Sequence, residues 1–379
     1  MNINYTKIPS PCYVIDEDRF RKNLSLIRHV SDESGAEIIL AFKAFAMWGV
    51  FDILREYVSG AAASSVNEAR LCFDEIGSLA HTYSPAFKES EFDSILKYSS
   101  HITFNSIRQY NKFRSVLKNH SGKISAGLRI NPEFSEISRG IYNPCSPGSR
   151  LGVTTGDLDA GLPEGIDGLH FHLLFESDSY ALEKVLKVVE EKFGRFFPRL
   201  KWINMGGGHL ITGKDYNSGH LIKVLRDFIR RTGLHVILEP GSAFAWETGE
   251  LVASVEDIVH NNGIETAILD VSFTAHMPDC LEMPYKPSIV GATDAIEGKP
   301  TYRMGGNSCL SGDYFGDWSF DQELKIGDRI VFEDMIHYTM VKTTMFNGVS
   351  HPGIGIWTTR NEFKMIREFG YEDYKNRMS

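Results

Sequence analysis

Short apolar runs alternate with longer amphipathic segments through much of this chain. Between Ala36 and Pro240 there are eight such runs, and in the intervening segments apolar residues recur at helical spacing, as at Leu182, Val185 and Val189. The expected strands are Ala36–Phe42, Ala61–Ser64, Ala80–Tyr83, His101–Phe104, Lys123–Arg129, Ile166–Leu173, Lys201–Met205 and Leu234–Leu238. Eight β-α units in about two hundred residues predict an α/β fold, the closed parallel TIM or (β/α)8 barrel.

A doubly wound open sheet is the alternative, and it ranks second because no glycine fingerprint follows the first expected strand. Beyond Ser242 the pattern changes to short alternating runs separated by Gly, Pro and Asn turns, which predicts a C-terminal antiparallel β domain. The predicted domains are residues 16–245 for the barrel and 1–15 with 246–379 for the β domain, a sandwich or small barrel. Its expected strands are Pro11–Ile15, Leu251–Val255, Thr266–Asp270, Arg329–Phe332 and Tyr338–Val341. A helix is expected after Trp357.

Composition narrows the classes of function. The chain has 379 residues, of which 42% are hydrophobic and 23% are charged, and this composition is typical of a globular protein. It has no apolar run long enough to cross a bilayer and no signal peptide, and its five scattered cysteines suit a reducing compartment rather than disulfides or a zinc site. A cytoplasmic protein without a bound metal is therefore expected. The net charge of −9 disfavours a nucleic-acid partner and suits a cationic ligand.

Lys43 follows the first expected strand, at the end of an apolar run where an ammonium group loses hydration. Such a loss lowers the pKa of the amine and makes its neutral form available to attack a carbonyl group. Catalytic groups of barrels lie at the carboxyl ends of the strands, which is where Lys43 would be. The alternative is a lysine that packs its stem on apolar neighbours and extends its charge to water.

Other strand ends carry complementary groups. Three glycines, Gly206, Gly207 and Gly208, follow the seventh expected strand, and Gly241 follows the eighth, where barrels often bind phosphate. A glycine triplet alone is more often a flexible turn. His172 ends the sixth strand and Glu239 the eighth. An amine, a phosphate loop, a histidine and a carboxylate around one barrel mouth match the needs of pyridoxal 5'-phosphate, whose ring nitrogen Glu239 would keep protonated.

Cys309 lies in a polar loop of the second domain, bounded by glycines, with Asp313 four residues later. A lone cysteine is usually a small buried hydrophobic residue. The polar loop favours a catalytic interpretation, but the residues alone leave both possibilities open.

Seven ordered segments resemble one family over essentially the whole chain, the fold-type III pyridoxal 5'-phosphate-dependent decarboxylases, which include the ornithine, diaminopimelate and carboxynorspermidine enzymes. The segments are Ala41–Ala44, Gly168–His172, Gly206–Gly208, Glu239–Gly241, Cys309–Asp313, His337–Thr339 and Phe346–Gly348. The resemblance implies the barrel-plus-β-domain arrangement of alanine racemase. It also implies that Lys43 bonds the cofactor, His172 stacks on its ring, Glu239 pairs with the ring nitrogen and Tyr338 approaches the phosphate.

The same resemblance implies an obligate head-to-tail homodimer with shared active sites. Cys309 and Asp313 of one subunit would complete the site of the other. Cys309 would then supply a proton to the substrate carbon that has lost carbon dioxide.

Departures from the family pattern bear on the substrate. In the diaminopimelate branch a glutamate and an arginine grip the distal amino acid end, and here Leu310 and Met283 take their places. An apolar pair cannot neutralise a buried carboxylate, so diaminopimelate is disfavoured. Ser242 replaces an arginine that usually contacts the phosphate, a contact left to the glycine amides and His209.

Residues 270–285 resemble the carboxynorspermidine decarboxylase branch and contain Asp279 and Glu282. With Glu176, which replaces part of the usual Gly-Ser after the cofactor histidine, these acids suit the spaced ammonium groups of a polyamine. The alternative for each is a solvated loop acid.

The expected activity is decarboxylation of carboxynorspermidine or carboxyspermidine to norspermidine or spermidine, a step of polyamine biosynthesis. An amino-acid racemase of the same fold, a decarboxylase of ornithine, lysine or diaminopimelate, and a non-enzymatic cofactor carrier remain the alternatives.

Overall fold

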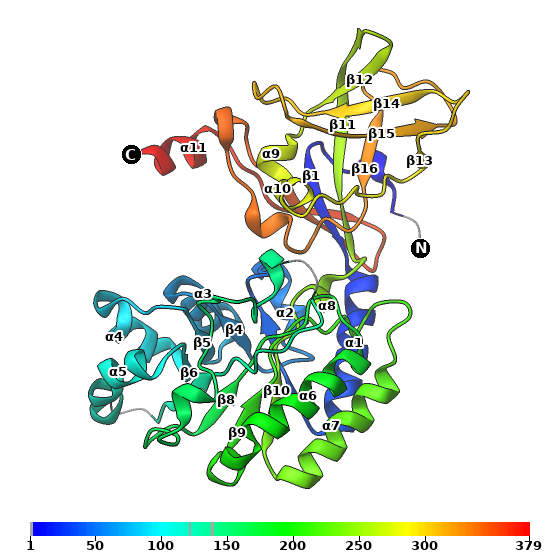
Figure 1. Ribbon diagram of the computed structural model, residues 1–379. Helices are drawn as coiled ribbons and strands as arrows, with labels where there is room; N and C mark the ends of the chain where they lie inside the picture. Colours follow the sequence, from blue (N-terminus) through cyan, green and yellow to red (C-terminus); the bar gives the residue numbers. More distant parts are fainter. Residues whose placement is uncertain (1–2, 121–122, 138–139) are drawn as a thin grey trace. The chain divides into compact units, whose positions relative to one another are not determined.

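The computed structural model describes residues 3–120, 123–137 and 140–379, which form two compact units. One unit comprises Asn23–Phe244, and the other comprises Met1–Lys22 with Ala245–Ser379 (Figure 1). Each unit has its own sheet.

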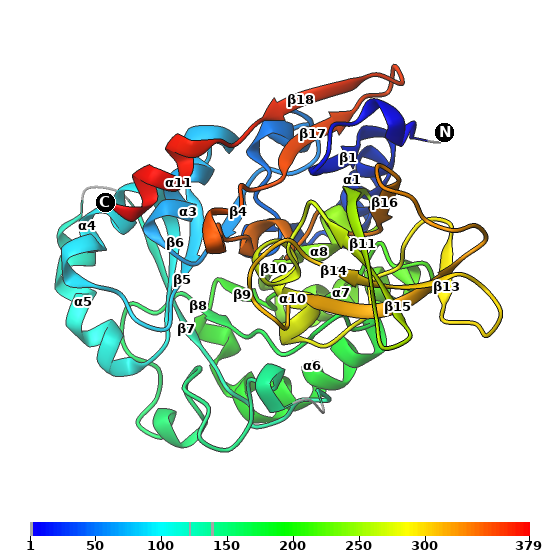
Figure 2. The same cartoon turned by 90° about the horizontal axis from the view of Figure 1, so that it is seen from above.

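The Asn23–Phe244 unit is a closed parallel barrel, as predicted (Figures 1 and 2). Its strands are β2 (Glu37–Ile38), β3 (Leu40–Ala41), β4 (Ala61–Ala63), β5 (Ala80–Tyr83), β6 (Ser99–Phe104), β7 (Ser125–Arg129), β8 (Gly168–His170), β9 (Trp202–Asn204) and β10 (His235–Leu238). β2 and β3 are two halves of the first expected strand, joined at Ile39. β2 pairs with β10 and β3 with β4, and the amide of Ile39 donates to the Leu238 carbonyl at 3.0 Å, which closes the ring of eight strands.

Helices separate the barrel strands, and polar caps begin several of them. The helices from α1 to α8 are α1 (Glu17–Ser34), α2 (Phe51–Leu54), α3 (Val66–Leu71), α4 (Glu89–Tyr98), α5 (Ile107–Asn119), α6 (Ser179–Phe193), α7 (Ser218–Thr232) and α8 (Ser242–Ala245). The side chain of Asp178 accepts from the amide of Ala181 at 2.8 Å to start α6, and Asn217 accepts from His220 at 2.9 Å to start α7. The apolar faces of both helices are buried, which accounts for the helical periodicity of the sequence.

The described residues of the other unit form a sheet of nine strands. They are β1 (Cys12–Asp16), β11 (Gly249–Asn261), β12 (Ile264–Leu269), β13 (Ala292–Asp294), β14 (Thr301–Gly305), β15 (Tyr314–Phe320), β16 (Arg329–Phe332), β17 (Gly353–Trp357) and β18 (Phe363–Arg367). The expected N-terminal strand joins the sheet between β11 and β17. The sheet is mixed rather than purely antiparallel, because β1 is parallel to β17 and β12 is parallel to β14.

One local prediction in this unit was wrong, and another was only partly right. Tyr338–Val341 is not a strand: Tyr338 has φ of 44°, a left-handed conformation that ends any extended run, and Met340–Lys342 forms a 3-10 turn. The segment after Trp357 contains β18, paired antiparallel to β17, before the terminal helix α11 (Tyr371–Met378). Two short helices, α9 (Phe273–His276) and α10 (Pro278–Glu282), follow β12.

Within the described ranges 3–120, 123–137 and 140–379, no helix is both long and apolar enough to span a membrane.

Candidate active site

Lys43 directly follows the first barrel strand, and its Nζ lies 3.3 Å from Nε2 of His172. The other ring nitrogen of His172, Nδ1, accepts the amide N–H of Gly207 at 2.8 Å. A neutral imidazole whose Nδ1 accepts must carry its proton on Nε2. That proton points to the Lys43 amine, which can accept it only in the neutral form. The hydrogen bonds therefore assign a neutral amine to Lys43.

The electrostatics of the site agree with this assignment. Burial lowers the pKa of Lys43, and the charge of Arg129 adds to the effect while Glu239 and Glu68 oppose it. Burial and the nearby Lys43 also hold the pKa of His172 well below its usual range. Part of the Lys43 side chain remains exposed to solvent, so the lowered pKa reflects protein atoms crowding the ammonium rather than complete exclusion of water. Lys43 is thus prepared to act as a nucleophile.

Glu239 follows β10 and is held by two polar residues, Asn204 on β9 and His170 on β8. Asn204 donates its side-chain amide to Oε1 at 2.6 Å, and Nε2 of His170 lies 3.5 Å from Oε2. Burial alone would raise the pKa of Glu239, but the hydrogen bonds from His170 and Asn204 outweigh it and the pKa is lowered. Glu239 is therefore a carboxylate at neutral pH, the form needed to hold a protonated pyridine nitrogen.

The glycine triplet is required by packing as well as by conformation. A Cβ on Gly207 would lie 2.2 Å from the Glu239 carbonyl oxygen, and one on Gly208 would lie 2.1 Å from the Leu174 carbonyl oxygen. Gly206 is also tied to the site, because its amide donates to Oδ1 of Asn204 at 2.9 Å. Gly241 packs against Ala44, where a Cβ would approach to 2.4 Å. These glycines let the loops pack closely around the strand ends that bear His172, Glu239 and Lys43.

Several residues of this cluster had no role in the sequence prediction. Arg129 is buried, donates to the His172 carbonyl at 3.4 Å and lies over the Tyr83 ring at 4.8 Å from its centroid. The Tyr83 ring in turn stacks on His170 at 5.3 Å. Asn204 and His170 sit inside otherwise apolar buried strands. A polar residue in such a strand was the signal that could have identified them.

His209, which follows the triplet, is only 1% exposed, and burial lowers its pKa to about 4. It is therefore a neutral imidazole. Ser242 opens α8 and so lies at the end of the same barrel strand as Glu239. A phosphate contact from either residue stays a prediction.

Cys309 lies in the loop between β14 and β15 of the sheet unit. The residue is exposed, and its amide donates to Oδ1 of Asn347 at 2.8 Å. Asp313 is 4% exposed and accepts the amides of Thr274 at 3.0 Å and Ser308 at 3.1 Å. Asp313 therefore stabilises the backbone of the loop that carries Cys309. A direct contact of Asp313 with substrate stays a prediction.

The other predicted substrate residues, and Tyr338, which was predicted to approach the cofactor phosphate, lie in different units. Asp279 and Glu282 are on α10 of the sheet unit, where Asp279 is buried and Glu282 forms an ion pair with Lys342. Glu176 is in the barrel unit, exposed on the loop after β8 with φ of 44°. Tyr338 has the same φ and is in the sheet unit. Asp279 and Glu282 thus share one short helix, and the roles of all four residues stay predictions.

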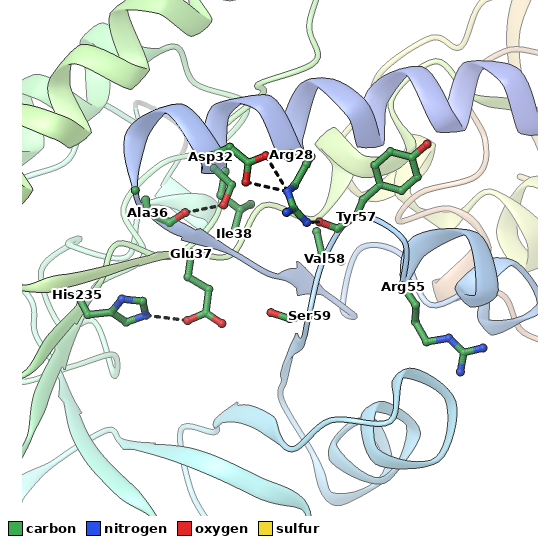
Figure 3. A pocket seen from close by; sticks show the side chains of 12 residues that line it. Arg28, Asp32, Ala36, Glu37, Ile38, Arg55, Tyr57, Val58, Ser59 and His235 are labelled. Atoms are coloured by element: carbon green, nitrogen blue, oxygen red, sulfur yellow. Dashed lines mark hydrogen bonds and ion pairs between the residues drawn. The ribbon is translucent and has the colours of Figure 1, made fainter.

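A groove of about 670 Å³ in the barrel unit is shown in Figure 3. It includes Glu37 at the start of the first strand, so it lies at the end of the barrel opposite to Lys43. Four of its ionisable groups form two pairs, Arg28 with Asp32 at 2.8 Å and His235 with Glu37 at 2.8 Å, while Arg55 pairs with Asp52 outside the lining. We assign no chemistry to this groove. In the part of the chain that the structure describes, no cluster of three or more His, Cys, Asp or Glu could hold a metal ion.

Comparison with known proteins places this chemistry in one family. Residues 12–336 match the model of the pyridoxal-dependent decarboxylase, C-terminal sheet domain. The chain belongs to the pyridoxal-dependent decarboxylase family. It is 48% identical over 378 residues to the carboxyaminopropylagmatine decarboxylase of Synechocystis sp., covering 100% of this chain and 97% of that protein. It is 46% identical to the carboxynorspermidine/carboxyspermidine decarboxylase of Campylobacter jejuni, covering 98% and 99% of the two chains.

A solved structure agrees with these relatives. The carboxynorspermidine decarboxylase of Campylobacter jejuni, crystallised in complex with norspermidine, superposes with a TM-score of 0.90 at 44% identity, covering 98% of this chain and 100% of that chain. These findings confirm the predicted fold-type III arrangement and the decarboxylase activity, with pyridoxal 5'-phosphate as the cofactor.

The residues of the barrel unit fit this cofactor. Lys43 offers a neutral amine for the aldehyde, Glu239 offers an ionised carboxylate for the ring nitrogen, and the triplet from Gly206 to Gly208 leaves no room for side chains beside them. When bound, the cofactor draws the electrons of the breaking carbon–carboxylate bond into its ring.

Proposed function

We propose that this decarboxylase acts on carboxynorspermidine or carboxyspermidine and releases norspermidine or spermidine, a step in polyamine biosynthesis. The observation that carries the proposal is the pair of acids on α10, Asp279 and Glu282, in a chain that has Met283 and Leu310 where a distal carboxylate would need a cation. The names of the Campylobacter jejuni relative and of its norspermidine complex support the same substrates.

A second candidate is carboxyaminopropylagmatine, the substrate in the name of the relative that is 48% identical. As an agmatine derivative it ends in a guanidinium group instead of a primary ammonium. Both candidates are long chains with a carboxyl-bearing end and further cationic centres, and both suit acids on α10. Arg and Lys head groups differ in shape and in the number of donors, so one enzyme should prefer one of the two.

The residues of the chain would divide the reaction as follows. Lys43 and the triplet Gly206–Gly208, with Gly241 and Tyr338, hold the cofactor, His172 covers its face and Glu239 keeps its ring nitrogen protonated. The carboxyl group leaves as carbon dioxide and its bonding electron pair stays behind. The same carbon then takes a proton from the thiol of Cys309, which regains one from water.

A head-to-tail homodimer is part of the proposal, with Cys309 of one subunit acting in the site of the other. Besides the family resemblance, it is supported by exposed apolar side chains around the Cys309 loop: Leu310 and Tyr314 are 46% and 45% exposed, and Phe346 beside Asn347 is 45% exposed. A second subunit would cover such side chains. A cytoplasmic location is also proposed, because the reaction needs Cys309 as a free thiol and the five cysteines are unpaired.

The test is a panel of substrates given to the purified, cofactor-loaded protein. Carbon dioxide and the product amine would be measured with carboxynorspermidine, carboxyspermidine, carboxyaminopropylagmatine, ornithine, lysine and diaminopimelate. Release of carbon dioxide from the carboxylated triamines is the expected result. Release only from ornithine, lysine or diaminopimelate would overturn the substrate proposal. Racemisation of an amino acid without release of carbon dioxide would show a racemase. The absence of any turnover would show a cofactor carrier.

A further inference from the structure

Helix α10 and the segment Thr339–Lys342 form two side-chain contacts in register. Thr339 donates its hydroxyl to Oδ2 of Asp279 at 2.9 Å, and three residues further along both segments Lys342 forms an ion pair with Glu282. The amide of Lys342 donates to the carbonyls of Tyr338 and Thr339, both at 3.2 Å, which fixes its backbone one turn beyond Tyr338. The two acids proposed to bind the substrate are therefore both contacted by this one segment.

The two acids, Asp279 and Glu282, differ in their hydrogen-bond and ion-pair partners. Asp279 is 5% exposed and accepts only hydroxyl groups, from Thr339 and from Tyr285 at 3.1 Å, while its Oδ1 has no hydrogen-bond partner among the described residues. Glu282 instead forms an ion pair with the ammonium group of Lys342, and the side chains of Glu282 and Lys342 remain 57% and 34% exposed. A buried carboxylate oxygen without a partner can accept an incoming cation directly. Glu282, in contrast, could bind a substrate ammonium only by releasing the ammonium group of Lys342.

The cation on Glu282 has the chemistry of the proposed substrate. Lys342 carries a primary ammonium on a four-carbon chain, and a polyamine ends in a primary ammonium on a three- or four-carbon chain. A partly exposed ion pair of this kind changes an equilibrium by only about two- to fivefold. Its cation can therefore be replaced readily by a similar one that is delivered by a bound substrate.

We infer that Lys342 is a specificity-determining residue that occupies Glu282 in the substrate-free enzyme and is displaced by an ammonium group of the substrate. The inference rests on the proposed function, because it takes Glu282 as a substrate-binding residue. Substrates too short to reach Glu282, such as ornithine, leave the pair with Lys342 intact and gain nothing from that acid. A carboxylated triamine can pair with Glu282, but only after its ammonium group has displaced that of Lys342. The Lys342–Glu282 pair therefore determines how strongly a long cationic chain is favoured.

A merely structural role makes a different prediction. If Lys342 only tied α10 to the segment beyond Tyr338, its loss would loosen both, lower the melting temperature and leave KM unchanged or raised. As an internal competitor, its loss should lower KM for the triamine.

The experiment uses the cofactor-loaded enzyme and the variant Lys342→Met, which keeps the length of the side chain but not its charge. We expect KM for carboxynorspermidine and the inhibition constant of norspermidine to fall by about two- to fivefold, with kcat and the melting temperature essentially unchanged. The matched control is Lys364→Met on β18, which removes the same charge from the same unit away from α10 and should leave KM unchanged.

Glu282→Gln separates this inference from the proposed function. Alone it should raise KM for the triamine, and in its presence Lys342→Met should have no further effect on KM. If Glu282→Gln raises KM but Lys342→Met does not lower it, the inference fails and the proposed function stands. If Glu282→Gln leaves KM unchanged, Glu282 is not a substrate residue, and the proposed pocket and the inference are both overturned. Equal effects of Lys342→Met and Lys364→Met would show a general charge effect and also contradict the inference.

Discussion

Asn204 is expected to keep Glu239 ready for the cofactor, and Asn204→Leu tests this. The side chain is 3% exposed, donates to Glu239 at 2.6 Å and accepts the amide of Gly206 at 2.9 Å. Leucine has a similar size and makes neither bond. A hydrogen bond to a charged group contributes about 1.5–3 kcal/mol, and each 1.36 kcal/mol corresponds to one pKa unit, so the pKa of Glu239 should rise by about one to two units.

The assay is the binding of pyridoxal 5'-phosphate to the apoprotein, followed by absorbance and fluorescence between about pH 3.5 and pH 8. Because only the ionised Glu239 can pair with a protonated ring nitrogen, affinity should fall on the acid side, and the midpoint of that fall should move up by about one to two units in Asn204→Leu. Asn217→Ser is the matched control: it removes an amide side chain remote from Glu239 and keeps a residue that can cap α7.

If a folded Asn204→Leu protein lost cofactor affinity at the same pH as the wild type, the prediction would be refuted, because the ionisation of Glu239 would then not depend on Asn204. A shift of the same size in Asn217→Ser would show that the change is not specific to the contact with Glu239. Melting curves of both variants would establish that they are folded before their affinities are compared.

Three further predictions concern single residues. Borohydride reduction of the loaded enzyme should fix the cofactor to the peptide that contains Lys43; label on another lysine would contradict that role. Lys43→Ala and Cys309→Ala proteins, each inactive, should regain part of the activity when mixed under conditions of subunit exchange, and no recovery despite proven exchange would mean that each site is built from one chain. Burial raises the pKa of Glu250 from 4.5 to about 7, which means that the folded state binds its proton more tightly than the unfolded state. The free energy of unfolding should therefore decline as the pH rises from about 4.5 to about 7; denaturant titrations should show a smaller decline in Glu250→Gln, and an identical profile would contradict the assignment.

The barrel could be predicted because its strands are buried on both faces and therefore read as short apolar runs. The ends of those strands meet at one face of the barrel, so the convergence of Lys43, His172 and Glu239 followed from chain order alone. The mixed sheet could not be predicted in the same way. Its parallel pairs, β1 with β17 and β12 with β14, join segments that are not consecutive strands, and local alternation carries no information on such pairing.

The supporting residues of the site were missed for a related reason. Asn204 on β9 and His170 on β8 contact Glu239, and Lys342 pairs with Glu282 from a segment 60 residues away. A polar residue in an apolar strand marks Asn204 and His170 as unusual, but the local sequence does not indicate which group each one contacts, because each contact depends on the register of strands or turns. The predicted strand over Tyr338–Val341 failed through backbone conformation, since the left-handed Tyr338 is not signalled by a glycine or an asparagine at that position.

The central claim is that this decarboxylase selects a long carboxylated polyamine. The most direct measurement is a competition in which equal concentrations of carboxynorspermidine, carboxyaminopropylagmatine, diaminopimelate and ornithine are given together to the loaded enzyme, and the early products are quantified by mass spectrometry. The ratio of products equals the ratio of kcat/KM values. Norspermidine, or the corresponding agmatine product, should dominate, and the lysine and putrescine formed from diaminopimelate and ornithine should be minor products. Lysine or putrescine as the main product would contradict it.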